Sequence, residues 1–393
     1  MTVRDRDSAV TVRDSAARLN GRAVRVTSPV PADVWNAVAG ADPCITPFQL
    51  PAWRDCVCYG GDWADASRLY ELPGGRQLVL MLARRPARPR RLAVEASWPG
   101  GWGSGGLLAT GGVRPEDVAL VNADLAAGRS LSVRVRPGFA AAELWAERAQ
   151  ASLVIPRAVH VAHFDGPFED YFNRSVSAKR RAMLRNARRH LERAGVVITD
   201  GNSPELVRGF YDVYLQWIAW RAVQRKVPVG LATWRTRRAE PLEKFTAMAS
   251  RLGEGCRIWV AWWEGRPIGA TISLYAGDNA VGWRAVADRS APPRFRVFEL
   301  LAVEALRHAC ESGRRRMELG ESVGKEDLAR VKERIGGQEQ ASPEFCFERI
   351  PLAQGRLTFE RLRRQAEQRI IGHRHGDGQV RDQASEPATE RPS

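Results

Sequence analysis

The chain has 393 residues, of which 44% are hydrophobic and 27% are charged, as is usual for a globular protein. Its length is enough for more than one hydrophobic core, so we expect two domains. The net charge of +15 favours a polyanionic partner such as RNA, a phosphorylated substrate or a membrane surface. No apolar run approaches the roughly 18 residues that a spanning helix needs, so we expect no membrane span.

The first 21 residues lack the apolar core of a signal peptide, and we expect a disordered leader there and a cytoplasmic protein. The six cysteines form no CxxC pair and have no histidine at ligand spacing. We therefore predict reduced thiols, no metal site and no cofactor. The sequence leaves the oligomeric state open.

The first half of the chain mixes helical and strand patterns. Apolar spacing predicts a helix at residues 30–39, a short amphipathic segment at 47–57 and a strand at 76–84. A glycine-rich loop at 99–112, a helix at 115–127 and a strand at 131–135 are expected to follow. Pro115 suits the first turn of its helix. We interpret the glycine-rich loop as a flexible hairpin.

A strongly basic helix lies near the middle of the chain. Residues 177–195 read SAKRRAMLRNARRHLERAG and hold seven lysines and arginines against one acid, a net charge of +6. Such a surface favours an anionic partner. The alternative is that Met183, Leu184, Ala187 and Leu191 pack inward while the arginines face water.

The second half predicts a regular order of elements. Apolar residues recur at helical spacing from Leu206 to Trp217, and an antiparallel meander follows. Its strands are expected at 257–263, 267–275 and 280–287, then a helix at 295–312 and a strand at 316–319. A last amphipathic helix is expected at 353–372, and a disordered tail at 373–393.

Several segments carry a resemblance to a known family. The turn and strand WEGRPIGATISLY resemble the third strand of the GNAT acyltransferase fold. More narrowly, three segments resemble the second domain of the FemABX-like branch, which duplicates this fold. They are FEDYFNRSVSAKRRAMLRNARRHLERAG, GWRAVADRSAPPRFRVFELLAVEALRHACESGRRRMELGE and ESVGKEDLARVKERIGG.

This resemblance implies an α+β protein made of two tandem GNAT-like acyltransferase domains, each a mixed central sheet flanked by helices. The expected domains are residues 22–165 and residues 166–352, the second opened by the basic helix. The implied activity is transfer of an acyl or aminoacyl group to an amine. In the best known members the donor is aminoacyl-tRNA and the acceptor is a cell-wall peptide precursor.

The predicted catalytic residues are Lys332, Glu318 and Glu321. Aminolysis needs a neutral amine and a donor for the developing oxyanion. The family pattern supports Lys332 as the charged donor near the reacting carbonyl, and the alternative is a solvated helix lysine. Glu318 and Glu321 flank Gly320, where a carboxylate can orient or deprotonate the amine. Salt bridges to nearby arginines are the alternative for both acids.

The predicted substrate-binding residues are Trp283, Arg284 and Arg294. A cation beside a tryptophan on an apolar strand can point into the cleft, although an outward-facing arginine is the alternative.

The choice of donor depends on residues 288–298, DRSAPPRFRVF. CoA-dependent GNAT domains normally have a glycine-rich loop here, whose amides bind the pyrophosphate at a helix N-terminus. This stretch has no glycine, and its two prolines provide no amide donor. The absence of a glycine-rich loop favours aminoacyl-tRNA as the donor. Bases of its single-stranded end can stack on Trp217 and Trp220. The alternative is that these tryptophans belong to the core. The predicted tRNA-binding residues are Lys179, Arg180, Arg181, Arg185, Arg188 and Arg189.

Three hypotheses follow. The first is an aminoacyl-tRNA-dependent transferase that forms an amide on a small amine-bearing acceptor, either a cell-wall precursor or a natural-product amine. The second is an acyl-CoA-dependent N-acyltransferase that acts on an amino sugar or natural-product amine. The third is a non-catalytic module that binds RNA or another polyanion.

Overall fold

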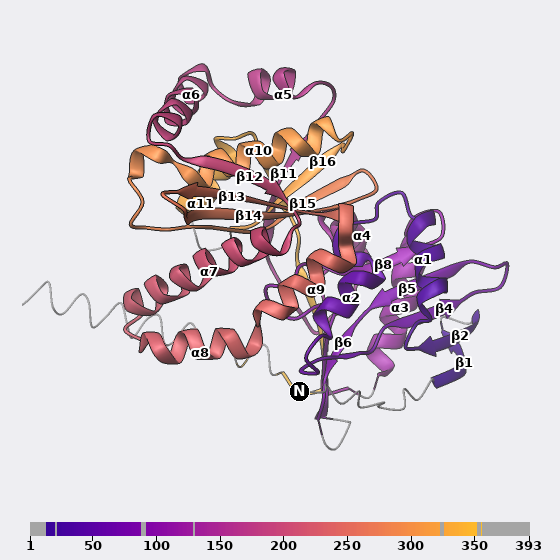
Figure 1. Ribbon diagram of the computed structural model, residues 1–393. Coiled ribbons are helices and arrows are strands. Elements are labelled where there is room, and N and C mark those ends of the chain that lie inside the picture. Colours follow the sequence, from indigo (N-terminus) through magenta and orange to yellow (C-terminus); the bar gives the residue numbers. More distant parts are fainter. Residues whose placement is uncertain are drawn as a thin grey trace, which may run out of the picture.

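The computed structural model describes residues 13–19, 22–87, 92–128, 130–322, 326–351 and 355. Two α+β halves lie side by side, with the N-terminal half in indigo to purple and the C-terminal half in magenta to orange (Figure 1). This arrangement confirms the mixed α+β class, with helices flanking mixed sheets.

The N-terminal half is built mainly from short strands. Its strands are β1 Arg13–Leu19, β2 Arg22–Ser28, β3 Ala64–Asp65, β4 Arg68–Glu71, β5 Gln77–Met81, β6 Ala83–Arg85, β7 Val94–Ala96, β8 Gly106–Ala109, β9 Ser132–Val135 and β10 Leu153–Ile155. Its helices are α1 Ala32–Ala41, α2 Pro51–Val57, α3 Pro115–Ala127 and α4 Ala142–Arg148. The helix that the sequence predicts at 115–127 is confirmed, with Pro115 in its first turn.

The C-terminal half has longer elements. Its strands are β11 Ala158–His163, β12 Val197–Gly201, β13 Cys256–Trp263, β14 Arg266–Ala276, β15 Asn279–Ala287, β16 Arg316–Glu321, β17 Gln338–Ala341 and β18 Glu344–Glu348. Its helices are α5 Phe168–Ser175, α6 Ala178–Arg193, α7 Pro204–Gln224, α8 Val229–Ala239, α9 Leu242–Leu252, α10 Val297–Glu311 and α11 Glu326–Glu333.

One sheet organises the C-terminal half, with strand order β12-β13-β14-β15-β16-β11-β17. The predicted antiparallel meander is confirmed as β13, β14 and β15. β15 then pairs in parallel with β16 over three residue pairs, ending at Val281 and Glu318. Helices α7 and α9 pack on one side of this sheet, and α10 packs with α5 and α6 on the other. Because the parallel pairing of β15 with β16 ends at Val281, these two strands separate beyond that residue.

The N-terminal strands form two sheets, with orders β1-β2-β4-β5-β8 and β10-β18-β9-β7-β6-β3. The disordered leader expected at 1–21 is wrong for residues 13–19, because they form β1 and pair with β2 from Arg13–Ser28 to Leu19–Arg22. An edge strand is held by backbone hydrogen bonds on one side, so it needs no apolar periodicity to form. Residues 1–12 lie outside the described residues.

The two halves exchange strands, which shifts the expected domain boundaries. β11 precedes the expected boundary at residue 165, yet it pairs with β16 and β17 in the C-terminal sheet. β18 follows that sheet in the chain but returns to pair with β9 and β10. The expected C-terminal helix at 353–372 and tail at 373–393 lie outside the described residues, apart from Gly355.

An apolar cluster joins the two halves. Trp53 of α2 is fully buried, and its ring centroid lies 4.9 Å from that of Trp283 on β15 and 5.5 Å from that of Trp102. Trp102 belongs to the glycine-rich segment at 99–112, which we expected to be a flexible hairpin. A Cβ atom at Gly103, whose φ is +90°, would lie 2.5 Å from the Phe48 ring. The segment is therefore packed against the interface, and its glycines allow close approach.

Helix α6 forms for local reasons. The Ser177 hydroxyl caps its first turn by accepting a hydrogen bond from the Arg180 amide at 3.3 Å. Leu184, Ala187 and Leu191 recur on its buried face, as the apolar spacing predicts.

Candidate active site

The candidate site lies where β15 and β16 separate. Lys332 of α11 reaches this point, and its Nζ donates hydrogen bonds to the carbonyls of Gly320 at 2.8 Å and Glu321 at 3.1 Å. Gly320 has a φ of +77°, and a Cβ there would lie 3.5 Å from the Gly282 carbonyl across the gap. Lys332 is only 6% exposed, so it is a buried cation at the strand separation and not a solvated helix lysine.

Glu318 shares this site as a buried carboxyl on β16. Burial raises its pKa above the ordinary value of 4.5, although the nearby charges of Arg136 and Lys332 oppose the shift. Its side chain makes no ion pair among the described residues. A buried carboxyl with a raised pKa close to a cation is a candidate for proton transfer.

Glu321 has a different environment three residues along the same strand. Its two oxygens form ion pairs with Arg136 at 2.9 Å and Arg157 at 2.8 Å, and Arg157 also pairs with Glu344 at 2.7 Å. Burial alone would raise the pKa of Glu321, but the two arginines outweigh it and hold the pKa below 4.5. The salt-bridge alternative therefore describes Glu321, which joins β16 to the N-terminal half.

His160 of β11 completes this cluster, and the sequence analysis did not select it. Its side chain is 1% exposed, and its Nε2 lies 3.8 Å from a carboxylate oxygen of Glu333. Burial and then the charge of Lys332 lower its pKa below 6.5. The signal in the sequence was a histidine within the apolar strand AVHVAH.

A pocket of about 820 Å³ opens nearby, between the ends of α7 and β15 and the starts of α10 and α11; we call it the α7–α10 pocket. Ala285 on its wall is three residues, roughly 10 Å, along β15 from Gly282. Trp217 and Trp220 also line it. The guanidinium of Arg221 lies 4.5 Å from the Trp217 ring centroid, and that of Arg289 lies 5.0 Å from the Trp220 ring centroid.

The loop before α10 forms one rim of this pocket. Its amides at Phe295 and Arg296 donate to the carbonyls of Pro292 at 2.9 Å and Pro293 at 3.2 Å. The first turn of α10 carries Glu299, whose carboxylate lies 2.5 Å from Arg180 of α6 and 3.1 Å from Arg296. Two of the loop's amides are thus used within the loop, and a protein carboxylate lies at the helix start.

The predicted substrate-binding residues do not gather in one place. Trp283 donates its Nε1 hydrogen to the Gly101 carbonyl at 2.9 Å, and Arg284 pairs with Glu240 at 2.7 Å. Both side chains therefore lie between the two halves, outside the α7–α10 pocket. Arg294 is exposed beside that pocket, with its guanidinium 5.8 Å from the Phe295 ring centroid.

The predicted tRNA-binding residues divide into two groups. Arg180 is buried, Arg181 donates to the carbonyls of Asn173 and Val176, and Arg188 pairs with Glu304. The exposed side chains of Lys179, Arg185 and Arg189 form no ion pair in the part of the chain that the structure describes. In this second group, the exposed charge is therefore engaged in neither an ion pair nor a hydrogen bond with the described part of the fold.

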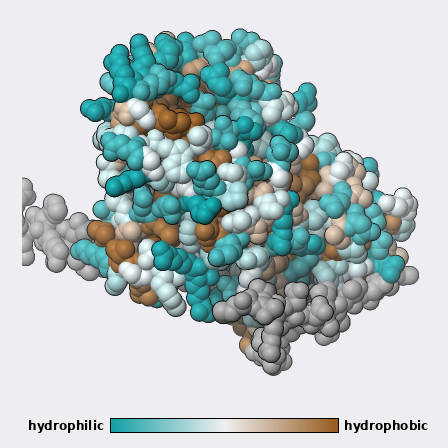
Figure 2. Space-filling view, in the orientation of Figure 1, coloured by the Kyte–Doolittle hydropathy of each residue, from teal (hydrophilic) through white to brown (hydrophobic). Residues whose placement is uncertain are grey.

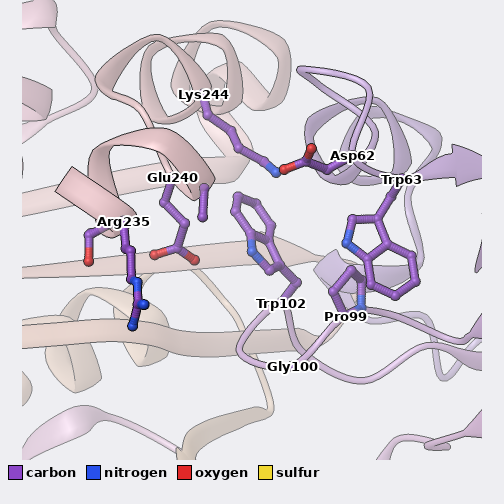
Figure 3. Close-up of a pocket in the computed structure, with 10 residues that line it drawn as sticks. Asp62, Trp63, Pro99, Gly100, Trp102, Arg235, Glu240 and Lys244 are labelled. Atoms are coloured by element: carbon purple, nitrogen blue, oxygen red, sulfur yellow. The ribbon is translucent and has the colours of Figure 1, made fainter. Parts of the chain in front are cut away.

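A second pocket of about 380 Å³ lies between the two halves (Figure 3). Lys244 points into it from α9, and its Nζ lies 4.2 Å from the Trp102 ring centroid and 3.3 Å from the Val57 carbonyl. Burial lowers the pKa of Lys244 below 10.5. Glu240, at the end of α8, also lines the pocket and accepts hydrogen bonds from the Tyr214 hydroxyl at 2.5 Å and from Arg284 at 2.7 Å. Sequence reasoning missed this pocket because its walls come from segments far apart in the chain.

Neither a metal site nor a membrane-spanning helix is present in the described residues. No group of three or more His, Cys, Asp and Glu side chains among them could hold a metal ion. No helix in the same ranges is long and apolar enough to cross a membrane.

Comparisons with known proteins agree with this architecture. Residues 178–328 match the family described as acetyltransferase (GNAT) domain. The crystal structure of FemX is similar with a TM-score of 0.58 and 11% identity, covering 84% of this chain and 98% of FemX. The structure of L-PGS from Bacillus licheniformis has a TM-score of 0.49 and 14% identity, covering 85% and 97%.

A tandem GNAT protein from the clavulanic acid biosynthesis pathway has a TM-score of 0.47 and 14% identity, covering 81% of this chain and 94% of its own. No curated protein matches the sequence. The match shows a GNAT-like acyltransferase domain over residues 178–328. The FemX-like fold extends over both halves of the chain, so the chain is similar to FemX in fold.

Proposed function

We propose that this protein transfers an aminoacyl group from aminoacyl-tRNA to an amine-bearing acceptor and forms an amide bond. The observation that carries the proposal is the start of α10. There, Pro292 and Pro293 provide no amide donor. The amides of Phe295 and Arg296 donate to carbonyls within the loop, and Glu299 lies in the first turn of the helix.

This arrangement opposes the binding of CoA. A pyrophosphate at a helix start needs free amides and the positive end of the helix dipole. In this protein the Glu299 carboxylate already meets that dipole and is paired with two arginines. A pyrophosphate at the same place would have to displace a buried ion pair.

The α7–α10 pocket favours a nucleotide end instead. Its tryptophans and arginines are residue types that stack on bases and bind phosphates. Helix α6 packs on the loop at residues 293–295, so its exposed Lys179, Arg185 and Arg189 extend basic surface beyond the pocket rim. A charged tRNA would place its terminal nucleotide in the pocket and its backbone along α6.

The proposed reaction is aminolysis of an ester. Glu318 accepts a proton from the acceptor ammonium, and the neutral amine attacks the ester carbonyl. Lys332 stabilises the oxyanion of the tetrahedral intermediate. The bond from carbon to the ribose oxygen then breaks, the nitrogen of the intermediate gives up its second proton, the ribose oxygen takes up a proton in exchange, and the amide remains on the acceptor. Glu321 positions the end of β16 through its two arginines.

One incubation tests the proposal. Purified protein is mixed with candidate amines and either total aminoacyl-tRNA or separate acyl-CoAs, and amide product is measured by mass spectrometry. We expect product in the tRNA arm, lost after ribonuclease treatment. Product in the CoA arm alone would refute the proposal.

The alternative is an acyl-CoA-dependent N-acyltransferase acting on an amino sugar or natural-product amine. It is favoured by the description of the matched family as an acetyltransferase domain. Absence of product with every donor and amine would instead favour a non-catalytic polyanion-binding module.

A further inference from the structure

The turn between α7 and α8 carries an unusual number of exposed apolar side chains. Val223 is 61% exposed and Trp234 is 58% exposed, and α8 has no buried residue in its described range. The apolar face comprises Trp220, Val223, Val227, Val229, Leu231 and Trp234. Figure 2 shows hydrophobic side chains gathered at lower left, over this turn. We call this surface the hairpin face.

The charges around the hairpin face have one sign. Between Asp212 and Glu240 the chain has no acidic residue. It has six basic ones, Arg221, Arg225, Lys226, Arg235, Arg237 and Arg238. All except Arg221 are exposed, and none of the six forms an ion pair in the part of the chain that the structure describes. Exposed apolar groups and uncompensated positive charge thus share one projecting hairpin.

We propose that the hairpin face docks on a membrane surface that contains anionic lipids. Tryptophan favours the membrane–water interface, and aliphatic side chains gain free energy by entering the acyl boundary. Arginines and lysines around them bind anionic headgroups. A nucleic acid fits this face less well as a whole, because four of its six apolar side chains are aliphatic and offer no surface for a base to stack on.

The local backbone suits such a role. Lys226 has a φ of +54° and Pro228 precedes α8, so the turn between the helices is tight. The hydroxyl of Tyr211 on α7 donates to the Glu240 carbonyl at 3.1 Å and secures the far end of α8. The hairpin therefore presents its side chains from a fixed frame, and docking needs no unfolding.

The test is co-sedimentation of the full-length protein with vesicles, with neither tRNA nor acceptor present. Its result is therefore independent of the proposed transferase function. Vesicles of mixed phosphatidylglycerol and phosphatidylcholine are compared with phosphatidylcholine alone. We expect binding to the mixed vesicles, and binding to phosphatidylcholine at least about tenfold weaker because the headgroup attraction is absent.

Two double variants separate the contributions. Leu231→Ser with Trp234→Ser removes apolar contact and should weaken binding by at least about tenfold. Arg235→Gln with Arg238→Gln should weaken it by roughly thirtyfold at low salt. The matched control is Arg185→Gln with Arg189→Gln on α6, which removes the same charge elsewhere and should leave vesicle binding unchanged. All these side chains are exposed, so melting temperatures should match that of the parent.

Three results would overturn the proposal. The first is equal binding of the parent and both hairpin variants. The second is an equal loss in the α6 control, which would show a response to net charge alone. The third is concentration-dependent self-association in sedimentation velocity that Leu231→Ser with Trp234→Ser abolishes, because a second copy would then cover the face.

Discussion

The guanidinium of Arg180 in α6 lies 2.5 Å from the carboxylate of Glu299 in the first turn of α10. Both side chains are largely buried, at 8% and 12% exposure. The most basic helix of the chain therefore uses one arginine to hold the rim of the α7–α10 pocket. Arg180 therefore supports the fold, whereas the exposed Arg185 and Arg189 of the same helix remain available to a polyanion.

Replacing Arg180 by Met should destabilise the protein by about 3 kcal/mol, because Glu299 then loses a buried partner. Arg180→Met with Glu299→Met should recover much of this loss, since no buried charge remains unpaired. Urea unfolding measures both. Lys179→Met, at an exposed neighbour, is the control and should change stability little. Equal costs for the single and double variants would contradict the ion-pair interpretation.

The exposed arginines of α6 should affect RNA binding and not folding. For Arg185→Gln with Arg189→Gln, the slope of log affinity against log salt should fall by roughly 1 to 2, because fewer counterions are released. Binding of labelled aminoacyl-tRNA at several salt concentrations measures this. Arg148→Gln with Arg349→Gln removes the same charge from the N-terminal half, and an equal effect there would argue against a specific α6 surface.

Lys332→Met should lower the rate of amide formation by roughly 10² to 10³, because the developing oxyanion loses its charged donor. The pre-steady-state rate at saturating donor is the suitable measurement. Arg330→Gln lies on the exposed side of the same helix and should keep the parental rate. A parental rate for Lys332→Met in folded protein would remove Lys332 from the mechanism.

Glu318→Gln should reduce activity and raise stability. Because burial raises the pKa of Glu318 above 4.5, the folded state keeps this proton at pH values where the unfolded chain has lost it. Stability therefore falls as pH rises from about 4 through the folded pKa and stays lower above it. Gln removes this penalty, so the variant should be more stable than the parent at neutral pH and similar to it in acid.

The activity of the same variant provides a second readout. Loss of the general base should lower the rate by roughly 10² to 10⁴ and abolish the acidic limb of the pH–rate profile. An acidic limb that persists in Glu318→Gln would assign the base to another group.

Glu321 should show the opposite dependence on pH. Its pKa is held below 4.5, so its stabilisation is present above that value and is lost as pH falls through the folded pKa. Glu321→Gln should cost about 2 kcal/mol at neutral pH, and the cost should diminish in acid. The exposed Glu254→Gln is the control. A cost that does not change with pH would mean that the ion pairs contribute little.

The sequence by itself determined the elements that depend on neighbours in the chain. The helix over Pro115–Ala127 follows from Pro115 in its first turn and inward apolar residues. The meander of β13, β14 and β15 follows from apolar runs separated by turn residues. Helix α6 begins where Ser177 can cap it. Periodicity and capping act over a few residues, so one segment carries the information.

Only the tertiary structure decided which charges meet and which strands pair at long range. Arg180 finds Glu299, His160 lies beside Lys332, and β18 returns to the N-terminal sheet. Glu318 and Glu321 look equivalent in the sequence, yet burial raises one pKa and two arginines lower the other. Burial and ion pairing depend on distances between residues remote in the chain, and local patterns do not contain those distances.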